Sequence, residues 1–93
     1  MIYAYVHLKI DNPDSLAKYR EVAAQALAKH GGSVVSASKD VALLEGNNET
    51  PHMAALLSFP DQENAHAWIN DKELQDVHAL RRNSGQSTIH LMA

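Results

Sequence analysis

Residues 53–59, Met-Ala-Ala-Leu-Leu-Ser-Phe, are apolar on both faces of an extended strand. Successive side chains of a strand point to opposite faces. One face would therefore carry Met53, Ala55, Leu57 and Phe59, and the other Ala54 and Leu56. A strand with two apolar faces is usually covered on both sides. A domain built around this strand must cover both faces of its sheet.

Two long elements precede this strand. Residues 2–10 alternate between apolar and other side chains, which is the period-two pattern of a strand. Residues 13–30 repeat apolar side chains at three- and four-residue steps, which indicates a helix. Asn12 and Pro13 suit the start of that helix, and Gly31-Gly32 supplies the left-handed residue that ends it.

The remaining segments complete an alternating order of strands and helices. Residues 33–46 hold two extended pieces, 33–36 and 41–45, which predict either one bent strand with a bulge or a small hairpin. Residues 61–70 and about 72–82 indicate helices, and 87–92 a last strand. The order β-α-β-β-α-β favours one ferredoxin-like α+β domain over residues 1–93, with a four-stranded antiparallel sheet and both helices on one face.

This arrangement leaves one sheet face without helices, although the strands carry apolar residues for two faces. A chain of 93 residues buries only about 60–65% of its unfolded surface, so a second copy would help it bury more. The simplest solution is a two-fold homodimer with the sheets face to face. The alternative is a monomer with an apolar open face.

Composition excludes several classes of protein. The net charge of −3 and the scattered basic residues argue against nucleic acid as a partner. No apolar run approaches the ~20 residues of a membrane span. The chain has no cysteine and shows no signal-peptide pattern, so the cytoplasm is the default expectation.

A set of short motifs, in order and spacing, resembles the DUF1330 family of the dimeric α+β barrel group. The motifs are Ala4-Tyr5-Val6, Asn12-Pro13, Tyr19, His30-Gly31-Gly32, Leu44-Glu45-Gly46, Phe59-Pro60, Ala65, Ala67-Trp68 and Leu80-Arg81. The resemblance covers nearly all of residues 2–92 and implies the barrel fold and a homodimer. Similar sequences often carry an aromatic residue at Ile69 and a tyrosine near Leu74, so a pocket lined by those rings would be altered here.

Four residues could converge between the helices and the sheet: Tyr19, His30, Trp68 and Arg81. An apolar pocket with a few polar groups is the usual site for a small, apolar or aromatic molecule. An arginine there would hold a carboxylate or enolate through its bidentate fork. Structural alternatives are core packing for the two aromatic residues, a helix cap for His30 and a solvated helix end for Arg81.

An enzyme is the second hypothesis. Related families on this barrel include cofactor-free monooxygenases and haem-degrading enzymes, and His7, Trp68 and His78 resemble the polar residue, tryptophan and histidine of the latter. His7, His30 or His78 could also act as acid or base in a small oxygenase or isomerase, although His78 could equally be a surface residue. We expect no metal site, because no carboxylate joins the neighbouring His7 and His90 at metal-ligand spacing and no His-x-x-x-His pair lies on a helix. We also expect no bound cofactor. A structural dimer without a ligand is the third hypothesis.

Overall fold

The computed structural model describes residues 1–93, and its element order matches the predicted one. The elements are β1 (Ile2–Ile10), α1 (Pro13–Ala28), β2 (Ser33–Ser38), β3 (Met53–Phe59), α2 (Gln62–Asn70), the 3₁₀ helix η1 (Lys72–Leu74), α3 (Gln75–Asn83) and β4 (Gly85–Met92). The ferredoxin-like α+β fold is therefore confirmed. No helix has both the length and the apolar character needed to cross a membrane.

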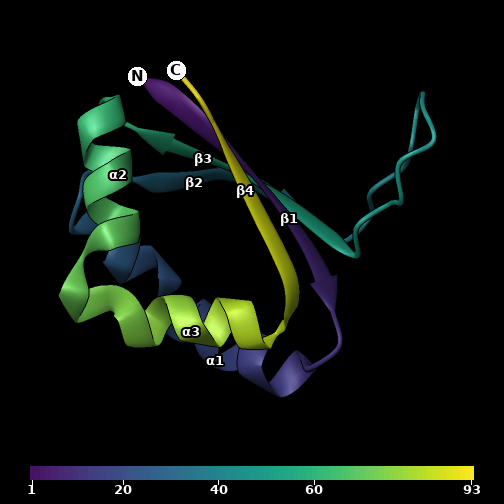
Figure 1. Cartoon of the computed structure of the whole chain (residues 1–93), viewed down its shortest axis with the longest axis horizontal. Helices are drawn as coiled ribbons and strands as arrows, with labels where there is room; N and C mark the ends of the chain where they lie inside the picture. Colours follow the sequence, from purple (N-terminus) through teal and green to yellow (C-terminus); the bar gives the residue numbers. More distant parts are fainter.

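The four strands form one antiparallel sheet in the order β2-β3-β1-β4. The helices lie along one face of this sheet (Figure 1). Ala4, Val6 and Leu8 of β1 are buried beneath them, whereas Tyr3 and Tyr5 are exposed on the opposite face. The alternation of β1 thus separates a helix-covered face from an open face.

Helix α1 begins where the sequence predicts and ends at Ala28, two residues before the predicted end at residue 30. The side chain of Asn12 accepts a hydrogen bond from the backbone N–H of Ser15 at 3.3 Å, and Pro13 opens the first turn. Gly31 follows the helix with φ +72°, a left-handed conformation that favours glycine. The hydroxyl of Ser15 donates to the carbonyl of Leu80 at 2.7 Å and so ties α1 to α3.

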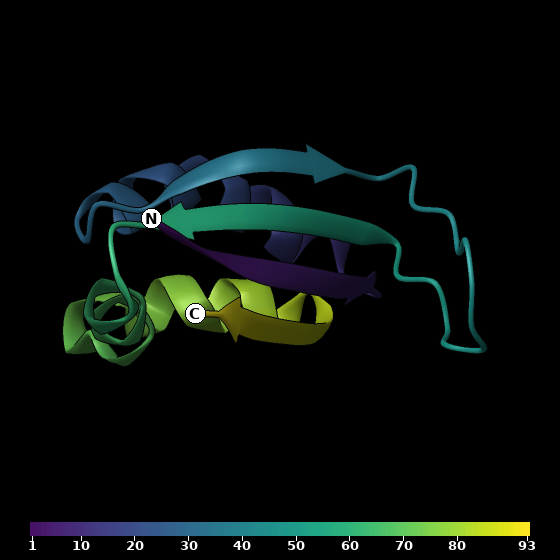
Figure 2. The ribbon, with the colours of Figure 1, turned by 90° about the horizontal axis from the view of Figure 1, so that it is seen from above.

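The segment after β2 differs from both predicted alternatives. β2 contains six residues, with a register shift between Val34 and Ser36, and residues 41–45 form no strand. The chain instead projects as an extended arm, defined here as residues 39–51, well beyond the sheet (Figure 2). The strand tendency of 41–45 is not realised because this chain offers it no neighbouring strand.

The candidate ligand cavity

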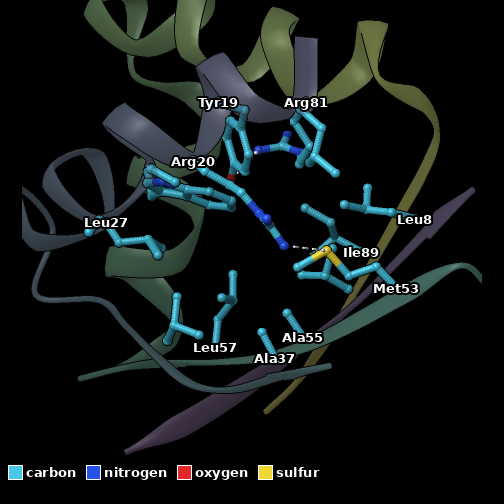
Figure 3. A pocket seen from close by; sticks show the side chains of 16 residues that line it. Leu8, Tyr19, Arg20, Leu27, Ala37, Met53, Ala55, Leu57, Arg81 and Ile89 are labelled. Carbon is cyan, nitrogen blue, oxygen red and sulfur yellow. Dashed lines mark hydrogen bonds between the residues drawn. The ribbon is translucent and has the colours of Figure 1, made fainter. Parts of the chain in front are cut away.

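A cavity of about 250 Å³ lies between α1, α3 and the helix-facing side of the sheet (Figure 3). Sixteen residues line it and 14 of them are hydrophobic; the other two are Arg20 and Arg81. The lining therefore contains two positive charges and no acidic side chain. An apolar chamber whose only charged groups are cationic suits an apolar molecule that carries negative charge.

Small side chains leave this space open. Ala23 and Ala24 of α1 face Ala37 of β2 and Ala55 of β3 across the cavity lining. Larger residues such as Leu27, Leu57 and Trp68 close its sides. The alanines that favour the helix thus also create room between helix and sheet.

Arg81, in the last turn of α3, is only 2% exposed. Its hydrogen bonds come from Nη1, which donates to Oη of Tyr19 at 3.4 Å and to Nδ1 of His78 at 3.0 Å. The guanidinium also lies 5.3 Å from the ring centroid of Trp68 and 5.6 Å from that of Tyr19. None of these partners carries a negative charge.

No ion pair of the structure includes Arg81, so its charge has no counter-ion in the chain. Nε of Arg81 is buried without a hydrogen-bond partner, and so is Nε1 of Trp68. Buried charges are normally paired and buried donors are normally hydrogen-bonded. Two unpartnered N–H donors thus belong to residues that line one apolar cavity.

His78 is completely buried and holds the guanidinium of Arg81 through a hydrogen bond. Arginine can only donate, so Nδ1 of His78 accepts from Arg81, and Nε2 carries the proton that it donates to the carbonyl of Trp68 at 2.9 Å. Burial, together with the positive charges of Arg81 and Arg82, lowers the pKa of His78 below its usual value. The ring is therefore neutral, and the alternative of a surface residue is wrong.

His30 lies at the other end of α1 and does not line the cavity. Its Nε2 is 2.8 Å from Oδ2 of Asp71, which also accepts from Nζ of Lys29 at 2.8 Å. Hydrogen bonds from Lys29, from His30 and from the backbone of Glu73 hold the pKa of the Asp71 carboxyl well below its usual value. This cluster joins the end of α1 to the segment after α2.

His7 lies on the open face of the sheet, where its ring packs edge-on against Tyr5 with centroids 4.3 Å apart. The structure thus brings Tyr19, Trp68 and Arg81 together, places His78 behind them, and leaves His30 and His7 elsewhere. It also adds Arg20, which the sequence reasoning missed. Arg20 follows Tyr19 directly in α1, and that adjacency to the apolar stripe was the available signal.

Arg20 reaches across the cavity towards Met53, and its Nη2 lies 3.9 Å from the sulfur of that methionine (Figure 3). The side chain is exposed and joins no ion pair. No cluster of three or more histidine or acidic side chains is arranged to hold a metal ion. The chemistry of the cavity is thus that of guanidinium groups in an apolar chamber.

The comparisons with known proteins agree on the fold. Residues 1–93 match the model of a family described as a domain of unknown function, DUF1330. No curated protein matches the sequence. Similar solved structures include a protein of unknown function from Rhodopseudomonas palustris, with 16% identity, a TM-score of 0.73 and coverage of 98% of this chain and 79% of that one.

Two further solved structures are similar. One is a dimeric ferredoxin-like protein of unknown function from Jannaschia sp. CCS1, with 13% identity, a TM-score of 0.72 and coverage of 99% and 97% of the two chains. The other is an antibiotic biosynthesis monooxygenase, with 12% identity, a TM-score of 0.56 and coverage of 100% and 97%. At these identities the likeness concerns the fold alone.

Proposed function

The chain belongs to the DUF1330 family, and on the geometry of its cavity we propose that it binds a small organic acid. The apolar body of the ligand occupies the space between α1, α3 and the sheet, and its carboxylate or enolate meets Arg81. The observation that carries this proposal is a buried arginine with no counter-ion and an unpartnered Nε, in the wall of an apolar cavity.

The hydrogen bonds of Arg81 favour an anion with two oxygens. Nη1 is occupied by His78 and Tyr19, whereas Nε is unpartnered and Nη2 makes no hydrogen bond within the chain. The Nε and Nη2 edge is the one that can donate two parallel hydrogen bonds to a carboxylate. A ligand carboxylate would supply the missing negative charge and satisfy the buried donor together.

The size of the cavity supports a ligand with a single ring or a short chain. An apolar cavity of about 150 Å³ is large enough for benzene. The cavity here measures about 250 Å³, which leaves room for a ring and a short acidic side chain. Binding is favoured over catalysis by histidine, because His7 and His30 lie outside the cavity and both ring nitrogens of His78 are engaged.

Titration calorimetry with phenylacetate and its neutral counterpart phenylacetamide tests the proposal. We expect phenylacetate to bind at least about fivefold more tightly than the amide, since an arginine–carboxylate contact exceeds a neutral hydrogen bond by about 1 kcal/mol or more, and ~1.4 kcal/mol is tenfold. Arg81→Met should abolish this preference. Arg82→Met is the matched control, because Arg82 is the exposed neighbour on the same helix. Equal binding of both compounds, no binding of either, or an unchanged preference in Arg81→Met would contradict the proposal.

We also infer a homodimer in which the open face of the sheet packs on a copy of itself. Tyr3, Tyr5 and Met92 expose 38%, 36% and 54% of their surface on this face. Such a group of large apolar side chains marks an interaction surface. A similar solved structure is described as dimeric.

A cytoplasmic location stays a prediction, which fractionation of the host cells would test.

A further inference from the structure

The cavity has a buried end and an open end. Arg81 and Trp68 are buried at one end of its lining, on the side of α2 and α3. The lining residues that are exposed to solvent lie instead on α1 and β2, and they are Arg20, Ala24, Val34 and Ala37. β2 is an edge strand of the sheet, so the mouth of the cavity lies between α1 and this edge. One arginine thus lies inside the cavity and the other at its mouth.

Arg20 has no acidic neighbour on its own face of α1. Helical side chains three and four positions apart are neighbours, whereas adjacent ones such as Glu21 do not face each other. The positions three and four residues from Arg20 hold Leu16, Ala17, Ala23 and Ala24. No ion pair of the structure includes Arg20. Its charge is therefore unpaired at the mouth of an apolar cavity.

The one hydrogen bond of the Arg20 side chain goes to a weak acceptor. Its Nη2 lies 3.9 Å from the sulfur of Met53, at the start of β3, and a thioether accepts hydrogen bonds poorly. A long charged side chain on a helix surface commonly extends its head into water. The guanidinium of Arg20 is instead directed across the cavity to the sheet (Figure 3). A carboxylate at the mouth would offer this guanidinium a much stronger acceptor.

We propose that the ligand is a diacid, with one carboxylate held inside by Arg81 and a second held at the mouth by Arg20. This inference rests on the binding of an organic acid at Arg81 proposed above, and it narrows the class of that ligand. No acidic side chain lines the cavity, so nothing there repels a second negative charge. The second carboxylate takes up no space inside, because Arg20 is exposed. The apolar body between the two charges fills the chamber.

The two arginines should contribute differently to affinity. Arg81 is buried, so salt screens its contact with a carboxylate only weakly, whereas the contact of the exposed Arg20 is screened. An exposed ion pair raises an equilibrium constant by about two- to fivefold. The second charge of the ligand should therefore add a modest, salt-sensitive gain to the binding at Arg81.

Titration calorimetry with 1,4-phenylenediacetate and its monoamide tests the proposal. The two compounds share the ring and both arms and differ in the second negative charge. A symmetrical diacid can enter either way round, which alone favours it by about twofold, and the Arg20 contact should raise the preference to about four- to tenfold. At about 1 M salt, where the Debye length falls to ~3 Å, the preference should return towards about twofold. A preference of about twofold or less at low salt would overturn the second contact.

Arg20→Met should reduce the preference for the diacid to about twofold, because only the two orientations of the ligand then favour it. Lys18→Met is the matched control, since Lys18 is exposed on the same helix and does not line the cavity. This variant removes the same charge and should keep the full preference. Equal losses in the two variants would mean that only the net charge of the protein matters, and would overturn the contact at the mouth.

Reversing the charge at the mouth supplies a gain of binding that lost packing cannot imitate. 4-(Aminomethyl)phenylacetate carries an ammonium group in place of the second carboxylate. It should bind several-fold more tightly to Arg20→Glu than to the wild type, and equal affinities would contradict the proposal. Failure of these tests leaves the organic acid at Arg81 standing. If phenylacetate itself does not bind, or Arg81→Met keeps its preference over phenylacetamide, the proposed function fails and this inference fails with it.

Discussion

Nη1 of Arg81 donates to Nδ1 of His78 at 3.0 Å, so the side chain that holds the buried charge in place is itself a neutral acceptor. His78 in turn is held by the carbonyl of Trp68, which lies at the end of α2. A carboxylate in place of His78 would neutralise Arg81 and leave it nothing to attract. A neutral imidazole positions the guanidinium and keeps its full positive charge for a ligand.

Arg81→Lys separates the role of charge from the role of shape. Lysine keeps the positive charge but cannot present two parallel donors to a carboxylate. We expect phenylacetate to bind about tenfold more weakly to Arg81→Lys than to the wild type, because one of two charge-assisted hydrogen bonds is lost. Calorimetry measures the change. Unaltered affinity would mean that charge alone, without the fork, holds the anion.

His78→Leu should destabilise the fold by about 2–4 kcal/mol. Leucine leaves one donor of Arg81 buried without its acceptor, a loss of about 1–3 kcal/mol. It also leaves the carbonyl of Trp68 with only the long 3.5 Å hydrogen bond from the backbone N–H of Asp71, which adds about 1 kcal/mol. Urea unfolding followed by tryptophan fluorescence gives the free energy. His66→Leu on the exposed side of α2 is the control and should change stability by less than about 0.5 kcal/mol. Similar losses of unfolding free energy in both variants would show that the hydrogen bonds of the buried His78 contribute no more to stability than an exposed histidine does.

Stability should also fall in mildly acidic solution through His78. The pKa of His78 in the folded chain is lowered, first by burial and then by Arg81 and Arg82. Between the folded and the unfolded pKa, the unfolded chain therefore binds a proton at this ring and the folded chain does not. The stability that the neutral, buried ring of His78 contributes is complete above the unfolded pKa of about 6.5 and is lost as the pH falls below that value. His78→Gln does not titrate, and the other histidines are common to both proteins. The stability difference between wild type and His78→Gln should therefore shrink from pH 7 to pH 5; parallel profiles would contradict this.

The sequence predicted what depends on short-range periodicity. The alternation of residues 2–10 and the glycine at position 31 reappear as β1 and as the left-handed end of α1. The position of His30 depends instead on Asp71, a residue 41 positions away, so local pattern could not reveal their pairing. Residues 41–45 have the composition of a strand, but a strand forms only where another backbone is available to pair with it. Tyr19, Trp68 and Arg81 share one cavity, yet the missing counter-ion is visible only when every neighbour is known.

Gly85 is the residue whose replacement should damage the fold most directly. It opens β4 with φ +149°, a conformation that side chains rarely adopt, and a Cβ atom there would collide with the backbone carbonyl of Lys9 on β1. We expect Gly85→Ala to cost about 3 kcal/mol or more, because the backbone of the central strand cannot move away. Gly46→Ala is the matched control, since Gly46 in the arm also has a positive φ of 109° but an added Cβ would meet no atom within 4 Å. It should cost only about 1 kcal/mol, the price of the backbone conformation alone. Urea unfolding of the two variants measures the difference, and equal losses would show that the close approach of Gly85 to β1 contributes nothing to stability.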